Sequence, residues 1–422
     1  MLQHRSFVLY LCARVLATLG VQMQSVAIGW QVYAITGELV DLGLIGLAQF
    51  APFVVLVLPA GQVADRYDRR RIITVCFALQ LLCALFLLVF SLRQQTSVAP
   101  VFASLVLFGT ARAFMMPASQ AILMNIVPAE SFGRAVALSS SSFHVAVVIG
   151  PTLGGLLYLA GPTTVYTVVA VLITIAIVFM LFVQSSQALG SREPASLRGI
   201  LEGLTFVWTR PIVLGAISLD LFAVLLGGAV ALLPAYARDV LHVEASGLGL
   251  LRTAPGVGAA ITSLVLAVRP IERRAGAWMF GGVALFGLAT VLLGATQSFV
   301  VAVIALFLTG AGDMVSVYVR HILVQLETPD AIRGRVSAVN AVFIGASNEL
   351  GEFESGIMAA WLGLLPAIVI GGIATLAVTV IWAWRFPQLS KMNTFPSAKA
   401  SDVIAPVVPA EEVPRPSAGS GG

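Results

Sequence analysis

Long apolar segments separated by short charged turns dominate this chain of 422 residues. Hydrophobic residues make up 59% of the chain and charged residues 10%, whereas soluble domains carry about 25% charged residues. A helix needs roughly 20 apolar residues to cross the hydrocarbon core of a bilayer. Twelve segments meet this length, and they centre near Val21, Phe53, Leu82, Leu107, Val148, Ile173, Val224, Ala260, Leu285, Leu306, Ser347 and Thr375. The sequence therefore predicts an all-α membrane protein with twelve transmembrane helices.

The basic residues are distributed unevenly between the two sides of such a protein. If the first residues are cytoplasmic, 19 of the 24 lysines and arginines fall in cytoplasmic turns or termini, and only Arg93 and Arg238 fall on the opposite side. Arg14, Arg112 and Arg252 fall inside predicted helices. Because basic residues are retained on the cytoplasmic side, both termini are predicted to be cytoplasmic. Every basic cluster is a predicted membrane turn, so the net charge of +4 does not indicate nucleic-acid binding.

The chain contains an internal repeat at an offset of 201 residues. Pro128 recurs as Pro329, each followed by a Gly-Arg pair, and Arg112 has Asp313 as its counterpart. Two homologous halves of six helices are typical of secondary transporters, which handle substrate at the interface between the halves. The fold class predicted is therefore two pseudo-symmetric six-helix bundles.

The hydrophilic stretches divide the chain into four regions. We predict an N-terminal six-helix bundle over residues 1–183 and a cytoplasmic linker with an amphipathic helix over 184–210. A C-terminal six-helix bundle over 211–385 and a disordered cytoplasmic tail over 386–422, rich in Pro, Ala, Ser and Gly, complete the chain.

Residues 61–71 read GQVADRYDRRR, a burst of charge between two apolar segments. Five residues of this stretch resemble the signature of the turn between the second and third helices of the major facilitator superfamily: Gly61, Asp65, Arg66, Arg69 and Arg70. The residue string ADRYDRRR resembles the same turn in the branch of efflux permeases that includes the enterobactin exporter and drug:proton antiporters. The resemblance extends from about residue 14 to residue 385 and implies a transporter that works by alternating access.

We expect this turn to act as a gate on the cytoplasmic side. Asp65 is an anion near helix ends, where N-termini carry partial positive charge. The arginines can pair with Asp65, with Glu130 or with lipid phosphates, and such a clasp would hold one state of the transport cycle together. The alternative is that the arginines only fix the topology. The counterpart turn in the second half, at Glu272-Arg273-Arg274, lacks the glycine, so a second clasp is poorly supported.

The fifth apolar segment carries the string GPTLGG, which contains Gly150, Pro151, Gly154 and Gly155. The string resembles the glycine-proline motif of exporters in this superfamily, with Ala146 in place of an earlier glycine. Proline removes a backbone hydrogen bond, and glycines let helices approach closely. The resemblance favours export over uptake, and simple helix packing is the alternative.

Ionisable side chains inside the predicted helices are the candidates for proton coupling. A charge at the bilayer centre costs roughly 2.5–3.5 kcal/mol on insertion scales, so it needs a polar cavity and a partner. Desolvation favours the protonated form of a carboxyl group, whereas a neighbouring arginine favours the ionised form. An arginine–carboxylate pair that opens and closes can therefore load and release a proton. The candidates are Glu349 as first choice, then Asp220 and Glu352, with Asp313, Arg112 and Arg14.

The same residues allow other interpretations. The resemblance implies a proton-transfer role for Arg112, but it could instead tie its helix to the first or fifth helix through backbone carbonyls. The acids could be structural partners of Arg14, Arg112 or Arg252. The three glutamates at positions 349–354 could bind a metal ion, although no set of His or Cys ligands accompanies them and the three cysteines lie in apolar segments. We therefore predict neither a cofactor nor a metal site.

Amide and aromatic side chains in the first two segments suit contact with an amphipathic substrate. The candidates for substrate binding are Gln22, Gln24, Gln31, Gln49 and Phe50. Aromatic residues near helix ends, such as Trp30 and Tyr33, are more often anchors at the membrane interface.

These patterns predict a monomeric, multi-pass protein of the bacterial inner membrane that exports a small drug-like or siderophore-like molecule in exchange for protons. No GxxxxGK[ST] phosphate loop occurs, which argues against ATP hydrolysis. The sequence shows no clustered nucleophile, base and metal set of the kind a membrane enzyme needs. A lysolipid transporter or nutrient importer of the same fold and a non-transporting receptor remain alternatives.

Overall fold

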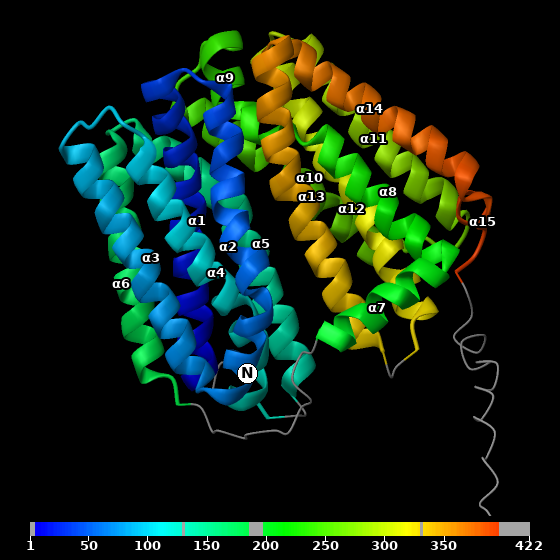
Figure 1. Cartoon of the computed structure of the whole chain (residues 1–422), viewed down its shortest axis with the longest axis horizontal. Helices are drawn as coiled ribbons and strands as arrows, with labels where there is room; N and C mark the ends of the chain where they lie inside the picture. The colour runs from blue at the N-terminus through cyan, green and yellow to red at the C-terminus, as the bar shows by residue number, and fades with distance from the viewer. Residues whose placement is uncertain (1–4, 129–130, 185–196, 330–331, 396–422) are drawn as a thin grey trace, which may run out of the picture.

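A computed structural model describes residues 5–128, 131–184, 197–329 and 332–395, and every regular element in these ranges is a helix (Figure 1). The first half consists of α1 (Arg5–Thr36), α2 (Leu39–Arg66), α3 (Arg69–Leu92), α4 (Ala99–Ile126), α5 (Phe132–Tyr158) and α6 (Pro162–Phe182), followed by α7 (Leu197–Thr209). The second half consists of α8 (Pro211–Gly227), η2 (Ala229–Leu232), α9 (Leu233–Ala235), η3 (Tyr236–Val240), α10 (Ala245–Val268), α11 (Ala275–Ala295), α12 (Phe299–Glu327), α13 (Arg333–Leu362), α14 (Leu364–Arg385) and α15 (Pro387–Ser390).

The long helices have the length and composition of membrane spans. Among the described residues, 11 helical segments are long and apolar enough to cross a membrane, one of them running from α8 through η3 as Pro211–Val240. The remaining long helix, α13, has 30 residues and carries the three glutamates at positions 349–354. It packs against α8, α14 and α2. The predicted all-α, twelve-helix arrangement is therefore confirmed.

Each set of six long helices packs into its own bundle. In the N-terminal bundle α1 contacts α5 and α6, while α3 and α2 both pack along α4. In the C-terminal bundle α12 lies between α10 and α11, and α8 contacts α13 and α14. Large apolar side chains fill both cores, including Phe7, Leu87 and Tyr166 in the first and Leu219 and Leu323 in the second.

Local sequence sets the tight links between helices. The Asp68 side chain caps α3 by accepting a hydrogen bond from the Arg70 N–H at 3.0 Å. Gly161 (φ +96°) joins α5 to α6, and Gly363 (φ +92°) joins α13 to α14. Glycine adopts these positive φ values at little steric cost. The two glycine links occupy corresponding positions of the internal repeat.

The two bundles meet along two seams, α2 against α13 and α5 against α10. Gly356 of α13 packs on Gly43 of α2, and an added Cβ atom at Gly356 would lie 2.9 Å from the Gly43 Cα. In the other seam Gly155 of α5 packs on Gly249 of α10. Small residues allow such close backbone contact. The ribbons converge at the end of the molecule where α1 ends and α2 begins, here named the closed end, and diverge toward the α7 end (Figure 1).

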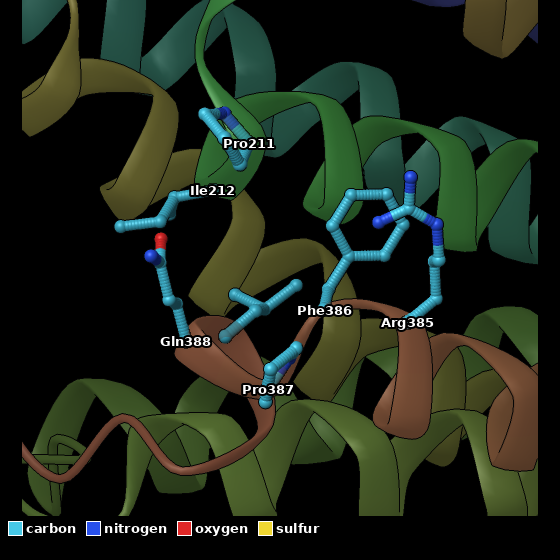
Figure 2. A pocket seen from close by; sticks show the side chains of 7 residues that line it. Pro211, Ile212, Arg385, Phe386, Pro387 and Gln388 are labelled. Carbon is cyan, nitrogen blue, oxygen red and sulfur yellow. The ribbon is translucent and has the colours of Figure 1, made fainter.

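The structure describes a helix in the linker and a packed segment at the start of the tail. The predicted linker helix is present as α7, whose Glu202 forms an ion pair with Arg335 of α13. Residues 185–196 and 396–422 lie outside the described part of the chain. The prediction of disorder is wrong for residues 386–395, because Phe386 and the fully buried Leu389 pack against Gly215 of α8 and Gly276 of α11. A cavity of about 320 Å³ remains beside them, between the start of α8 and α15 (Figure 2).

Candidate functional site

An ion pair joins the two bundles near the middle of their helices. Arg112 of α4 places its Nη1 atom 2.6 Å from Oε1 of Glu349 in α13. The guanidinium also lies 5.9 Å from the ring centroid of Phe53 in α2. The Arg112 side chain is 50% exposed and that of Glu349 is 12% exposed. The arginine therefore faces open space, while the carboxylate is largely covered.

A second acid lies one helical turn further along α13, inside the α2–α13 seam. An added Cβ atom at Gly46 of α2 would lie 2.7 Å from Oε2 of Glu352. Arg252 of α10 interacts electrostatically with Glu352, and its Nη1 donates a hydrogen bond to Ser25 Oγ of α1 at 2.9 Å. We name the four ionisable side chains at this junction the interface cluster: Arg112, Glu349, Glu352 and Arg252. When both acids are ionised, its formal charges cancel.

The interface cluster can change its charge by binding a proton. A cation within about 4–6 Å favours an ionised carboxylate, and removing that cation favours protonation. Arg112 stands on one bundle and Glu349 on the other, so a movement that separates the bundles also separates this pair. Proton binding at this pair would then be linked to movement of the bundles, because each equilibrium would shift the other.

Asp220 and Asp313 occupy a different place, inside the C-terminal bundle. Asp220 of α8 forms an ion pair with Arg320 of α12, and their side chains are only 6% and 5% exposed. Arg320 is one of the 19 basic residues assigned above to cytoplasmic turns or termini, and this assignment is wrong because α12 continues to Glu327. The missed signal is the spacing of seven residues from Asp313, which places both side chains on one face of a helix.

Arg14 is held within the N-terminal bundle. Its Nη1 donates a hydrogen bond to Ser139 Oγ of α5 at 2.6 Å, and its guanidinium lies 5.1 Å from the ring centroid of Phe143. No carboxylate among the described residues forms an ion pair with it. These contacts tie α1 to α5 and do not support the predicted role of Arg14 in proton coupling.

The signature turn lies at the α7 end, between α2 and α3. Arg69 Nε donates to the carbonyl oxygen of Ala64 at 3.1 Å, and Arg70 Nη2 donates to the carbonyl oxygen of Leu181 at the end of α6 at 2.6 Å. These two arginines therefore brace the turn against neighbouring backbone.

The rest of the predicted clasp is only partly described. Gly61 and the exposed Arg66 lie in the last turns of α2. The side chain of Asp65 and the whole of Glu130 lie outside the described part of the chain. A clasp centred on Asp65 therefore stays a prediction.

The glycine-proline string of α5 serves two contacts. Gly150 and Gly154 pack on α1 within the same bundle, where an added Cβ atom would lie 2.5 Å and 2.7 Å from α1 atoms. Gly155 and the carbonyl oxygen of Pro151 pack on Gly249 of α10 in the other bundle. The small residues of the string thus let α5 pack closely on α1 in its own bundle and on α10 across the seam.

The predicted substrate-binding amides do not share one environment. Gln31 Nε2 donates to Ser91 Oγ at 2.9 Å, and the Tyr166 hydroxyl donates to Gln31 Oε1 at 2.8 Å, all buried. Gln31 therefore belongs to the core of the N-terminal bundle, and these contacts do not support its predicted role in substrate binding. Gln24 is also buried, and its Oε1 has no hydrogen-bond partner among the described residues.

The other predicted substrate residues lie nearer the seams. Phe50 stacks on Phe53 with ring centroids 6.4 Å apart, beside the guanidinium of Arg112. Gln49 Nε2 donates to its own helix at 3.3 Å. Gln22 is half-buried against Gly150. Phe50 is thus linked to the interface cluster through the ring of Phe53.

A further contact between the bundles was missed by the sequence analysis. The Tyr33 hydroxyl of α1 donates to the Asp239 carboxylate of η3, and the Arg238 guanidinium lies 5.9 Å from the Tyr33 ring centroid. We name Tyr33, Arg238 and Asp239 the closed-end latch. Sequence spacing could not pair residues that lie 206 positions apart.

The described residues contain no group of three or more His, Cys, Asp or Glu side chains placed to hold a metal ion. Glu349 is instead paired with Arg112.

Comparisons with known proteins agree with this geometry. The family model described as transmembrane secretion effector matches residues 1–413. The multidrug efflux pump Tap of Mycolicibacterium fortuitum is 28% identical over 392 residues, covering 87% of this chain and 94% of the relative. The enterobactin exporter EntS of Shigella boydii serotype 18 is 25% identical over 406 residues, covering 94% of this chain and 96% of the relative.

Solved structures show the same fold at low sequence identity. A bacterial homologue of the human lysosomal transporter Spinster, in an inward-facing and unoccupied conformation, superposes with a TM-score of 0.73 at 16% identity, covering 92% of this chain and 97% of that chain. The family match extends over nearly the whole chain, and the described helices have the arrangement that it requires. This chain belongs to the transmembrane secretion effector family of the major facilitator superfamily and is a multi-pass membrane transporter.

Proposed function

We propose that this transporter exports a small amphipathic molecule in exchange for protons. The observation that carries the proposal is the Arg112–Glu349 ion pair, which links the two bundles at mid-helix. The similarity to a multidrug efflux pump and to an enterobactin exporter supports export of drug-like or siderophore-like cargo. The proton gradient supplies the energy, about 2.3 kcal/mol per charge for each 100 mV plus the pH term.

The α7 end and both termini face the cytoplasm of a bacterial inner membrane in this proposal. The basic residues of the α2–α3 turn, at positions 66–71, support this orientation through the retention of positive charge on the cytoplasmic side. The described form is then inward-facing, with its outer end closed by the two glycine seams and the closed-end latch. Both seams join parts of the same chain, so a monomer contains the complete route.

The interface cluster accounts for exchange in a simple order of steps. In the inward-facing form Glu349 is ionised and paired with Arg112. Cargo that enters beside Phe50 and Phe53 competes with this pair and lets the bundles rock. The α2–α13 seam then opens, and Glu349 and Glu352 meet the more acidic outer side, where one of them binds a proton as cargo leaves. Return to the inward-facing form restores the pair and releases the proton inside.

Transport in proteoliposomes tests the proposal directly. Ethidium serves as the probe of drug-like cargo and iron-free enterobactin as the probe of siderophore-like cargo. An imposed pH difference is the driving force. We expect at least one probe to move against its gradient while the pH difference is discharged. Transport that is indifferent to the pH difference would contradict proton coupling, and movement only in the proton's own direction would indicate uptake.

Tyr33→Phe is predicted to shift the balance toward the outward-facing form. The substitution removes a hydrogen bond between the bundles to a charged group, worth roughly 1.5–3 kcal/mol when fully formed, so the ratio of outward- to inward-facing protein should rise roughly ten- to a hundredfold. Spin labels on the exposed Gln95 and Gln297, one in each bundle at the closed end, report the change as a longer distance. Tyr158→Phe is the control, because Tyr158 contacts Trp30 within one half of the chain.

Asp65→Asn is predicted to slow transport several-fold without weakening substrate binding. An anion near a helix N-terminus contributes about 0.3–1 kcal/mol, enough to alter the lifetime of one state but not the cargo site. Turnover and equilibrium binding of the same probe separate the two effects. A collapse of binding affinity would show that Asp65 is not a gate.

A further inference from the structure

The outer face of α11 carries a groove that takes no part in the contacts between the bundles. α11 packs on α12 and α14 within the C-terminal bundle. The groove has a volume of about 420 Å³ and lies on the remaining, exposed face of α11, beside α12. In a membrane-spanning bundle such a face is turned toward lipid. The lining residues used below are Arg274, Trp278, Gly281, Gly282, Leu285 and Val315, the last from α12.

Two adjacent glycines form the floor of this α11 groove. Gly282 packs on α12, where an added Cβ atom would lie 2.7 Å from the carbonyl oxygen of Gly312. Gly281 opens into the groove, and an added Cβ atom there would meet no neighbouring heavy atom within 4 Å. The hollow therefore exists because Gly281 has no side chain, and a hydrocarbon chain can lie where that side chain would be.

Arg274 stands at one end of the groove, directly before the first residue of α11. Its backbone has a positive φ of +57°, and its N–H donates to the carbonyl oxygen of Asn393 in the packed segment after α14. Its guanidinium forms no ion pair and no side-chain hydrogen bond with any described residue. The position of Arg274 is thus fixed by its backbone, while its charge remains available to a ligand.

The exposed side chains around this end of the groove carry a net positive charge. Arg273, Arg274 and Lys391 face one acid, Glu272, which gives a formal charge of +2. Lys391 is a neighbour because the next carbonyl along the chain, that of Met392, accepts a hydrogen bond from the Gly276 N–H at 3.0 Å. A basic cluster at a membrane surface attracts anionic headgroups, and a guanidinium pairs well with a phosphate.

The chemistry along the groove follows the order of groups in a phospholipid. Trp278 lies one helical turn after Arg274 and is 53% exposed. Indole rings favour the interfacial level of a membrane, where headgroups meet acyl chains. Leu285 lies about 16 Å from Arg274 along the helix axis at 1.5 Å per residue. This length is close to half of a hydrocarbon core about 30 Å thick, which is one leaflet.

We propose that the α11 groove binds one anionic phospholipid of the surrounding membrane. The lipid phosphate pairs with Arg274, and one acyl chain runs past Trp278 and lies against Gly281 and Leu285. The apolar floor distinguishes this site from a site for free phosphate, and the net positive charge distinguishes it from a groove for neutral lipid. Arg274 and Gly281 belong to neither the interface cluster nor the closed-end latch, so the site is independent of the proposed export.

Lipid binding to the purified full-length protein in detergent tests the proposal. Native mass spectrometry gives the dissociation constant of the first bound phosphatidylglycerol, with phosphatidylcholine of the same acyl chains as the zwitterionic comparison. The parent protein should prefer phosphatidylglycerol. Gly281→Leu should weaken this binding about tenfold, because the leucine occupies the volume that the acyl chain needs. The variant should fold, because leucine is favoured over glycine in a helix and meets open space there.

The charge is tested separately from the volume. Arg274→Gln should weaken binding of phosphatidylglycerol about fivefold, in line with about 1 kcal/mol for a basic residue near an anionic surface. It should also remove the preference over phosphatidylcholine. Arg273→Gln is the matched control for charge, with a smaller effect expected. Gly133→Leu is the matched control for volume, because Gly133 of α5 also opens into free space.

Four results would overturn the proposal. The first is unchanged binding in Gly281→Leu, and the second is equal binding of the two lipids to the parent protein. The third is an equal loss in Arg273→Gln and Arg274→Gln, which would indicate attraction by surface charge alone. The fourth is competition by glycerol 3-phosphate at the same concentration as the lipid, which would indicate a site for a free phosphate.

Discussion

Glu349→Gln should abolish export driven by a pH difference. Glutamine keeps the size of the side chain but can neither bind nor release a proton, and it leaves Arg112 without a charged partner across the bundles. We expect at least a hundredfold loss of the pH-driven rate, in line with the 10²–10⁴-fold contributions of positioned proton-transfer groups. Exchange of labelled probe at equal concentrations on both sides should persist, because it needs rocking but no net proton movement.

The matched control for this experiment is Glu354→Gln. Glu354 lies on the same helix, but the Arg112 guanidinium pairs with Glu349 and not with Glu354. The Glu354→Gln variant should export at close to the rate of the unsubstituted protein. Its thermal unfolding temperature should match that of Glu349→Gln. A Glu349→Gln protein that still exports with normal pH dependence would remove Glu349 from the coupling role and leave Glu352 as the acid to test.

Arg320→Met should destabilise the protein more than any other single substitution of an arginine in the described helices. It leaves Asp220 without its partner in the dry interior of the C-terminal bundle. Breaking a buried pair from one side typically costs about 3–5 kcal/mol, whereas replacing both partners by apolar residues is often neutral. The double variant Asp220→Leu with Arg320→Met should therefore recover most of the lost stability.

Thermal unfolding in detergent, at fixed detergent and protein concentrations, measures these differences. Arg14→Met is the comparison, because Arg14 bonds to a neutral hydroxyl, Ser139, and a hydrogen bond of that kind contributes only about 0.5–1.5 kcal/mol. If Arg320→Met unfolds no earlier than Arg14→Met, the Asp220–Arg320 pair is not a structural element of the bundle.

The sequence was sufficient to predict the helices and the acids, because both depend on local chemistry. Apolar length identifies a span wherever it occurs, and a glutamate in the middle of such a span, such as Glu349, stands out without any knowledge of its neighbours. The repeat at an offset of 201 residues also predicted two equivalent bundles. These features could be predicted because each is contained in a short stretch of chain or in a simple comparison of two stretches.

The partners of these residues could not be predicted in the same way. The pairing of Arg112 with Glu349 and of Tyr33 with Asp239 depends on the rotation and height of helices in different bundles, which no local pattern specifies. Arg320 was assigned to a cytoplasmic turn, while α12 in fact continues for two more turns. The role of Gln31 is equally open to local patterns, because a polar residue in an apolar helix can face either a substrate cavity or a polar partner such as Tyr166.

The two glycine seams are equivalent in backbone but differ in chemistry. The α5–α10 seam is joined by a neutral contact, in which the hydroxyls of Thr152 and Thr253 lie 2.7 Å apart. The α2–α13 seam contains the carboxyl group of Glu352. Acidification should therefore loosen only one of two structurally matched contacts. The first movement out of the described form should then be an asymmetric rotation of one bundle relative to the other. The α5–α10 seam would act as the pivot, and the α2–α13 seam would open.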